Sequence, residues 1–141
     1  MYARVDLSKT NYNKLDNFKF IVDPDVALLD RLYTDYCRYK KFRSVMPIFS
    51  SEYIDKNNDV LGYYNNNDNL VAFSLIRRYS NTEAECVQFA WDYSDPKLSL
   101  GIASLKNECA VYKDLGFRYL YLGGADEYKK QIDGFELLGP V

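Results

Sequence analysis

The sequence contains no histidine, and this absence excludes several kinds of active site. A histidine general base, a Ser-His-Asp or Cys-His triad and histidine metal ligands are all ruled out. The three cysteines are an odd number, their spacing is not that of a metal site, and no signal peptide is evident. We therefore expect a cytoplasmic protein with reduced thiols and no bound metal.

Long apolar runs and an excess of basic charge are missing as well. No apolar stretch approaches the roughly 20 residues that span a membrane, so no membrane partner is expected. The formal net charge is −2, which disfavours strong nucleic-acid binding. The length of 141 residues predicts one domain over residues 18–141, preceded by an N-terminal arm or irregular lead-in over residues 1–17.

The stretch from Phe89 to Gly123 is the most informative part of the chain. It reads strand, loop, helix, strand, with period-2 alternation from Ala84 to Tyr93 and helical spacing from Ile102 to Leu115. The near-continuous apolar run from Tyr119 to Leu122 is typical of a strand buried on both faces.

The start of the central helix has features of an anion site. Ser99 can cap the helix, and Gly101 allows a ligand to approach the backbone closely. The free N–H groups and the positive dipole end of such a helix favour an anion, above all a phosphate.

The remaining patterns complete an α/β (α+β) fold in the order β-α-α-β-β-β-α-β-α, with a further short strand at the end. Three successive strands between helical layers predict a mixed sheet, with an antiparallel meander and one parallel βαβ step from Glu85 to Gly123. The other expected strands are residues 18–22, 60–64, 70–76 and 135–138, and the other helices run from Asp25 to about Lys41, from Ser50, and through Tyr128.

This order of elements resembles the GNAT fold, that of the Gcn5-related N-acetyltransferases. Local motifs look more specifically like the catalytic half of the leucyl/arginyl-tRNA–protein transferases, over about residues 28–138. The motifs that carry this resemblance are Asp95-Pro96, Ser99-Leu100-Gly101, Tyr121-Leu122-Gly123, Tyr128-Lys129 and Glu136-Leu137-Leu138.

The resemblance implies transfer of an acyl group to an amine. The donor would be acetyl-CoA or CoA-linked, with aminoacyl-tRNA as the alternative, and the acceptor a small amine or a protein amino group. The donor would lie in a gap between the strand at 84–93 and the strand at 118–122. The residues expected to bind it are the helix start Ser99, Leu100, Gly101, Ile102 and Ala103, the nearby Lys97, and the strand aromatics Phe89 and Trp91.

Without histidine, the base must be a carboxylate, a tyrosine or a relayed water. Asp92, on the strand that leads into the loop, is the candidate base. Tyr128 occupies the position of the family's Tyr-Lys pair, which implies a role as an acid or a substrate contact. Glu108, on the central helix, is expected at the surface.

A second hypothesis is a non-catalytic GNAT-like binding or interaction module. Leu98 stands where the acetyltransferase signature has Gln or Arg, and the segment Gly124–Glu127 is shorter than in the transferases, which favours a lost donor site. An RNA-binding accessory protein is a third hypothesis, weakened by the net acidity. A second copy that covers an exposed sheet edge, giving a homodimer, stays open.

Overall fold

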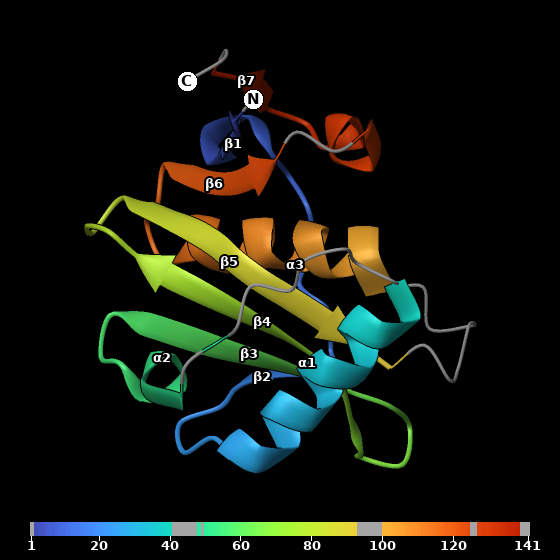
Figure 1. Ribbon diagram of the computed structural model, residues 1–141. Coiled ribbons are helices and arrows are strands. Elements are labelled where there is room, and N and C mark those ends of the chain that lie inside the picture. Colours follow the sequence, from blue (N-terminus) through green and yellow to red (C-terminus); the bar gives the residue numbers. More distant parts are fainter. Residues whose placement is uncertain (1, 41–47, 49, 93–99, 125–126, 139–141) are drawn as a thin grey trace. The chain divides into compact units, whose positions relative to one another are not determined.

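The structure is a computed structural model that describes residues 2–40, 48, 50–92, 100–124 and 127–138 (Figure 1). Seven strands form one sheet, hydrogen-bonded in the order β2-β3-β4-β5-β6-β1-β7. The chain forms two compact units, described separately below: residues 1–16, 77–87 and 99–141, and residues 17–76 and 88–98. Among the described helices, none combines the length and the apolar character needed to cross a membrane.

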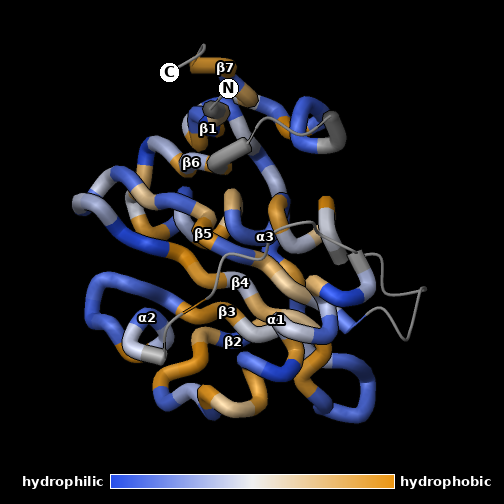
Figure 2. Tube along the Cα trace, viewed as in Figure 1, coloured by the Kyte–Doolittle hydropathy of each residue, from blue (hydrophilic) through white to orange (hydrophobic). Residues whose placement is uncertain are grey.

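The second unit contains the predicted meander and two helices. Its elements are β2 (Phe18–Phe20), α1 (Val26–Lys40), α2 (Ser50–Ile54), β3 (Asn58–Tyr64), most of β4 (Leu70–Arg78) and the end of β5 (Glu83–Trp91). Asp25 caps α1, because its Oδ1 accepts a hydrogen bond from the Leu28 N–H at 3.2 Å. Figure 2 shows a short hydrophobic stretch in β3, and Leu61 and Tyr63 of this strand are fully buried. β3 and β4 are neighbours in the sheet and are joined by a turn in which the Asn65 N–H donates to the Asn69 carbonyl at 3.0 Å.

The first unit is built around the βαβ step. Here α3 (Leu100–Asp114) connects β5 to β6 (Tyr119–Gly124), and these two strands are parallel, as predicted. The 3-10 helix η2 (Glu127–Gln131) and β7 (Phe135–Leu137) follow. The tail helix expected from the sequence is thus a short 3-10 turn.

The N-terminal residues differ from the expected arm or irregular lead-in. They form β1 (Tyr2–Asp6) and the 3-10 helix η1 (Leu7–Lys9). Figure 1 shows β1 between β6 and β7, and β1 is antiparallel to both. Ala3 and Val5 are fully buried, so this strand supplies core residues. Its alternating pattern is only five residues long, too short to distinguish from a polar lead-in by sequence alone.

Strand β6 is not buried on both faces, which corrects the sequence prediction. Leu120 and Leu122 are buried, whereas Tyr119 and Tyr121 are half-buried. The guanidinium of Arg4 on β1 lies 3.9 Å from the centroid of the Tyr119 ring. The tyrosines therefore form a partly solvated face, on which cationic side chains cover the Tyr119 ring and Arg4 donates to the Tyr121 hydroxyl.

Candidate functional site

The hydrogen-bond ladder between β5 and β6 is short. Paired residues run only from Glu83↔Tyr119 to Glu85↔Tyr121, although β5 continues to Trp91 and β6 to Gly124. Within this unit, Cys86 and Leu122 are the first residues beyond the ladder end. An early end of a parallel ladder leaves backbone groups that another partner must satisfy.

The register of β6 against β1 also changes at this point. Ala3 faces Gly123 and Arg4 faces Tyr121, so Leu122 is the extra residue of a bulge. Its carbonyl oxygen accepts a hydrogen bond from the Lys129 ammonium at 3.2 Å. Bulges of this kind redirect a strand and are common beside functional sites.

The first turn of α3 begins where the sequence predicted. Gly101, Ile102 and Ala103 are half-exposed, and the Ser104 hydroxyl donates to the carbonyl of Gly101 at 2.9 Å. A Cβ on Gly101 would meet nothing within 4 Å. The first N–H groups of a helix have no acceptor within the helix, an arrangement that suits an anion.

The β5 candidates lie in the second unit and share one end of that strand. Phe89 is half-buried, and its ring makes edge contacts with Tyr36 of α1 and Tyr63 of β3, with centroids 6.4 Å and 6.5 Å away. Trp91 is buried, and the N–H of Asp92 donates to the carbonyl of Val71 at 2.8 Å. Phe89 therefore has a packing role, which does not depend on a donor.

Four of the predicted site residues receive no structural test of their side chains. Lys97 and Ser99 lie outside the described residues, and Tyr128 is in η2 with its side chain outside them. Leu100 is the first residue of α3, and its side chain is likewise not described.

Sequence reasoning missed a buried polar cluster next to the ladder end. Glu108 is 3% exposed, which corrects the expected surface position, and its Oε1 accepts a hydrogen bond from the Cys86 thiol at 3.6 Å. Burial raises the pKa of the Cys86 thiol well above its usual value; Glu108 adds to the rise, and the Lys129 charge opposes it. The run from Cys109 to Tyr112 could have given the signal, because four consecutive apolar residues surround a helix on every side.

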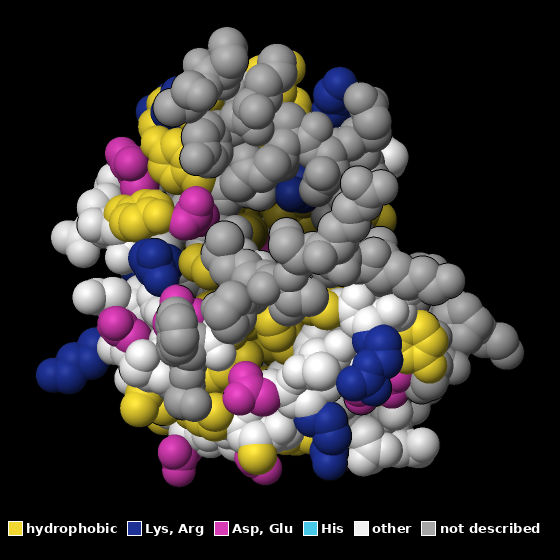
Figure 3. Space-filling model, in the orientation of Figure 1, with side chains coloured by type: hydrophobic (Ala, Val, Ile, Leu, Met, Phe, Trp, Pro, Cys, Tyr) yellow, Lys and Arg dark blue, Asp and Glu magenta, His cyan; other side chains and the backbone are white. Residues whose placement is uncertain are grey.

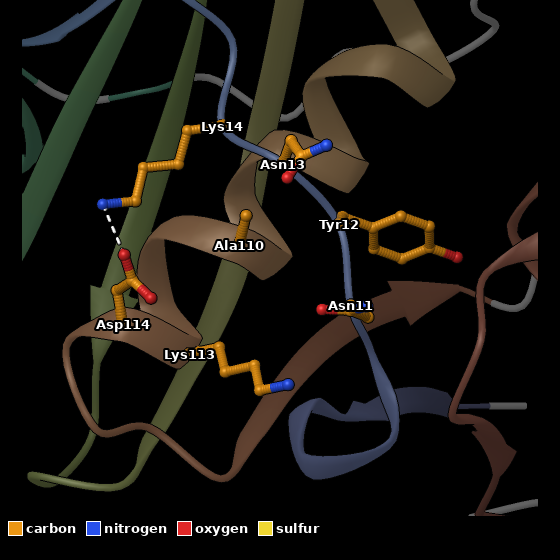
Figure 4. A pocket seen from close by; sticks show the side chains of 7 residues that line it. All are labelled: Asn11, Tyr12, Asn13, Lys14, Ala110, Lys113 and Asp114. Carbon is orange, nitrogen blue, oxygen red and sulfur yellow. Dashed lines mark ion pairs between the residues drawn. The ribbon is translucent and has the colours of Figure 1, made fainter.

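A separate groove of about 450 Å³ lies along the last turns of α3 (Figure 4). One wall is the segment Asn11–Lys14, and the other is formed by Ala110, Lys113 and Asp114. An ion pair of 2.5 Å joins Lys14 to Asp114, and the Lys113 ammonium donates to the carbonyl of Thr10. The charged side chains that line the groove are thus already paired with other groups of the protein. Figure 3 shows Lys and Arg side chains interspersed with Asp and Glu side chains over the described part of the face that is in view.

Solved structures with similar folds exist, although no family model and no curated protein sequence matches the chain. L-PGS from Bacillus licheniformis has a TM-score of 0.67 at 17% identity, covering 88% of this chain and 46% of its own. A structure from Novosphingobium aromaticivorans, assigned to the GNAT family of acetyltransferases, has a TM-score of 0.65 at 14% identity, covering 96% and 58%.

A ribosomal-protein-alanine N-acetyltransferase from Brucella melitensis has a TM-score of 0.63 at 11% identity, covering 89% of this chain and 97% of its own. By contrast, this chain spans about half the length of the first two structures, 46% and 58%. At these identities the likeness concerns the fold. The chain has the GNAT fold, as its order of elements predicted.

Proposed function

We propose that this protein is an N-acyltransferase that binds its acyl donor where β5 and β6 separate and holds the donor's pyrophosphate at the start of α3. The observation that carries the proposal is the short parallel ladder, which ends after three residue pairs at Glu85 and Tyr121. An extended donor arm binds between strands that no longer pair with each other, and in the described residues β5 and β6 pair no further than Glu85 and Tyr121, within a fold that hosts acyl transfer to amines.

The start of α3 is the second support. Two N–H groups, those of Gly101 and Ile102, belong to the unsatisfied first turn, and the helix dipole adds positive potential. A glycine in a helix costs roughly 0.5–1 kcal/mol relative to alanine. Among the described residues, no atom lies within 4 Å of a Cβ placed on Gly101, so close approach of a ligand is the physical reason for glycine that fits.

The donor class follows from this geometry together with the resemblance to GNAT proteins. Acetyl-CoA carries a pyrophosphate for the helix start and a long thioester arm for the strands. Aminoacyl-tRNA is the alternative donor, and a small amine or a protein amino group is the acceptor. Lys97, Ser99, Leu100 and Ala103 complete the proposed phosphate site, with Trp91 beside the acyl arm; Asp92 and Tyr128 are the base and the acid expected from the sequence.

Isothermal titration with acetyl-CoA, and separately with CoA, tests the proposal. We expect saturable binding that weakens at least tenfold in Gly101→Phe. Leu115→Phe is the matched control, since Leu115 is exposed beyond the other end of α3. The open space at Gly101 means that loss of binding there reports a blocked ligand instead of a disrupted core.

Absence of binding at millimolar acetyl-CoA would overturn the CoA-dependent form of the proposal. Aminoacyl-tRNA would then be titrated as the remaining donor. If neither donor binds, the protein is a non-catalytic module of the GNAT fold.

A further inference from the structure

The cluster at the ladder end joins three kinds of polar group from three elements. Cys86 comes from β5, Glu108 from α3 and Lys129 from η2. Cys86 is half-buried and Glu108 almost fully buried, so the thiol lies between the carboxylate and the more open side of the strand. Burying a carboxylate is costly unless charge or hydrogen bonds compensate it. Its presence beside the proposed donor arm therefore needs an explanation.

The position of Lys129 shows what the cluster faces. Its ammonium donates to Leu122 O, at the bulge of β6 that follows the end of the β5–β6 ladder. The same charge acts on the Cys86 thiol, lowering its pKa against the larger effect of burial. Lys129 therefore holds the bulge of β6 and acts electrostatically on the thiol of β5.

The contacts of Glu108 identify it as a hydrogen-bond acceptor. Cys86 donates its S–H to the Glu108 carboxylate, and the Lys129 charge acts on the same thiol. Cys109, the next residue on α3, has a pKa raised to about 12 by burial and then by Glu108. Glu108 is thus a buried acceptor whose charge raises the pKa of two thiols.

We propose that Glu108 is the catalytic base of the transfer reaction, and that Cys86 and Lys129 position it. This inference rests on the proposed function. The acceptor nitrogen attacks the thioester carbonyl carbon, the C–N bond forms, and the C–S bond breaks. Glu108 takes one proton from the nitrogen and passes it to the sulfur of the departing thiolate. An amide and a free thiol result, and no other reactant is consumed.

The helix geometry fits this assignment. Glu108 lies eight residues after Leu100, so it is roughly 12 Å along α3 from the proposed phosphate site. An extended thioester arm, held by its phosphates at the helix start and running along β5, would bring its acyl carbon toward the ladder end. Asp92, the base expected from the sequence, belongs to the opposite end of β5.

The test uses the whole chain, acetyl-CoA as donor and a panel of primary amines and lysine peptides as acceptors. Donor affinity is measured by titration, and CoA release is followed by chromatography between pH 6 and pH 9. We expect Glu108→Gln to bind acetyl-CoA within twofold of the wild type and to lose 10²–10⁴-fold in transfer rate. Asp114→Asn, an exposed carboxylate on the same helix, is the matched control and keeps the wild-type rate.

Two further variants separate catalysis from folding and from positioning. Glu108→Asp withdraws the carboxylate by one methylene, and we expect at least a tenfold slower rate with donor binding retained. Lys129→Met removes a cation that favours the ionised base, so the acidic limb of the pH–rate profile should move to higher pH. Lys129→Arg should return the acidic limb of the pH–rate profile to its wild-type position.

The outcomes distinguish the two proposals. Failure of the wild type to bind acetyl-CoA would refute the proposed function. Donor binding without transfer to any acceptor, or equal rates in the wild type and Glu108→Gln, would refute the role of Glu108 and leave the donor site standing.

Discussion

Asp6 and Gly134 are packed backbone against backbone. The Asp6 N–H donates to the Gly134 carbonyl at 2.9 Å, and a Cβ on Gly134 would overlap the carbonyl oxygen of Asp6. Gly134 also has a φ of +77°, which L-residues with side chains rarely adopt. This contact fixes the turn between η2 and β7 on the end of β1.

Gly134→Ala should therefore destabilise the fold by roughly 3 kcal/mol or more, because backbone strain and overlap add. Gly116→Ala is the matched control, since Gly116 has a φ of +93° but open space around a Cβ. We expect about 1 kcal/mol there, from strain alone. Urea midpoints measure both, and equal losses would show that the overlap with Asp6 relaxes freely.

The carboxylate of Asp6 predicts a specific loss of stability in acid. Hydrogen bonds from Arg118 and Ser8 lower the pKa of Asp6 below its ordinary value. A group whose folded pKa is depressed stabilises the fold above its unfolded pKa, about 3.9, and loses that contribution as the pH falls through the folded pKa. The stability gap between the wild type and Asp6→Asn should therefore be largest near pH 6 and shrink below about pH 4. Denaturant titrations at several pH values measure this gap, and a constant gap would contradict the prediction.

A buried amide holds the N-terminal segment on α3. Asn107 is fully buried, and its Oδ1 accepts a hydrogen bond from the Leu15 N–H at 2.7 Å. Asn107→Leu removes this acceptor, and we expect a loss of about 1–3 kcal/mol together with faster amide exchange at Leu15.

The exposed Lys14–Asp114 ion pair links the same two segments and provides the control. Lys14→Met should cost about 1 kcal/mol or less. An effect of Lys14→Met as large as that of Asn107→Leu would show that the ion pair, and not the amide, anchors the segment.

The thiols report directly on the buried carboxylate. Because Cys86 has a raised pKa, it should be alkylated more slowly at pH 8 than a free cysteine, and the buried Cys109 more slowly still. Glu108→Gln removes a negative charge that raises the Cys86 pKa, so Cys86 should react faster at a given pH. Mass spectrometry of timed alkylation measures each site, and an unchanged Cys86 rate would contradict the contact.

Local patterns were sufficient to predict most of the fold. The alternation in β5, the helical spacing in α3 and the start of α1 at Asp25 each arise from residues close together in the chain, and the structure confirms all three. The parallel βαβ step also followed, because a strand, a helix and a strand of these lengths have few other arrangements.

The features that the sequence did not predict depend on contacts between residues far apart in the chain. Strand β1 is recognisable only through its pairing with β6 and β7. Arg4 of β1 donates hydrogen bonds to Tyr121 and Glu136, which lie more than a hundred residues away in the chain. The burial of Glu108 depends on Cys86 of β5, and the half-buried face of β6 depends on Arg4. Ionisable residues are therefore where single-sequence reasoning about exposure failed.

The place of β1 between β6 and β7 also determines when the sheet can form completely during folding. Translation makes β1 before β6 and β7, so β1 stays without these partners until more than a hundred further residues have been synthesised. Pairing across so long a separation closes a large loop, which slows this step of folding. Until then Ala3 and Val5 lack the neighbouring strands among which they are buried in the folded protein.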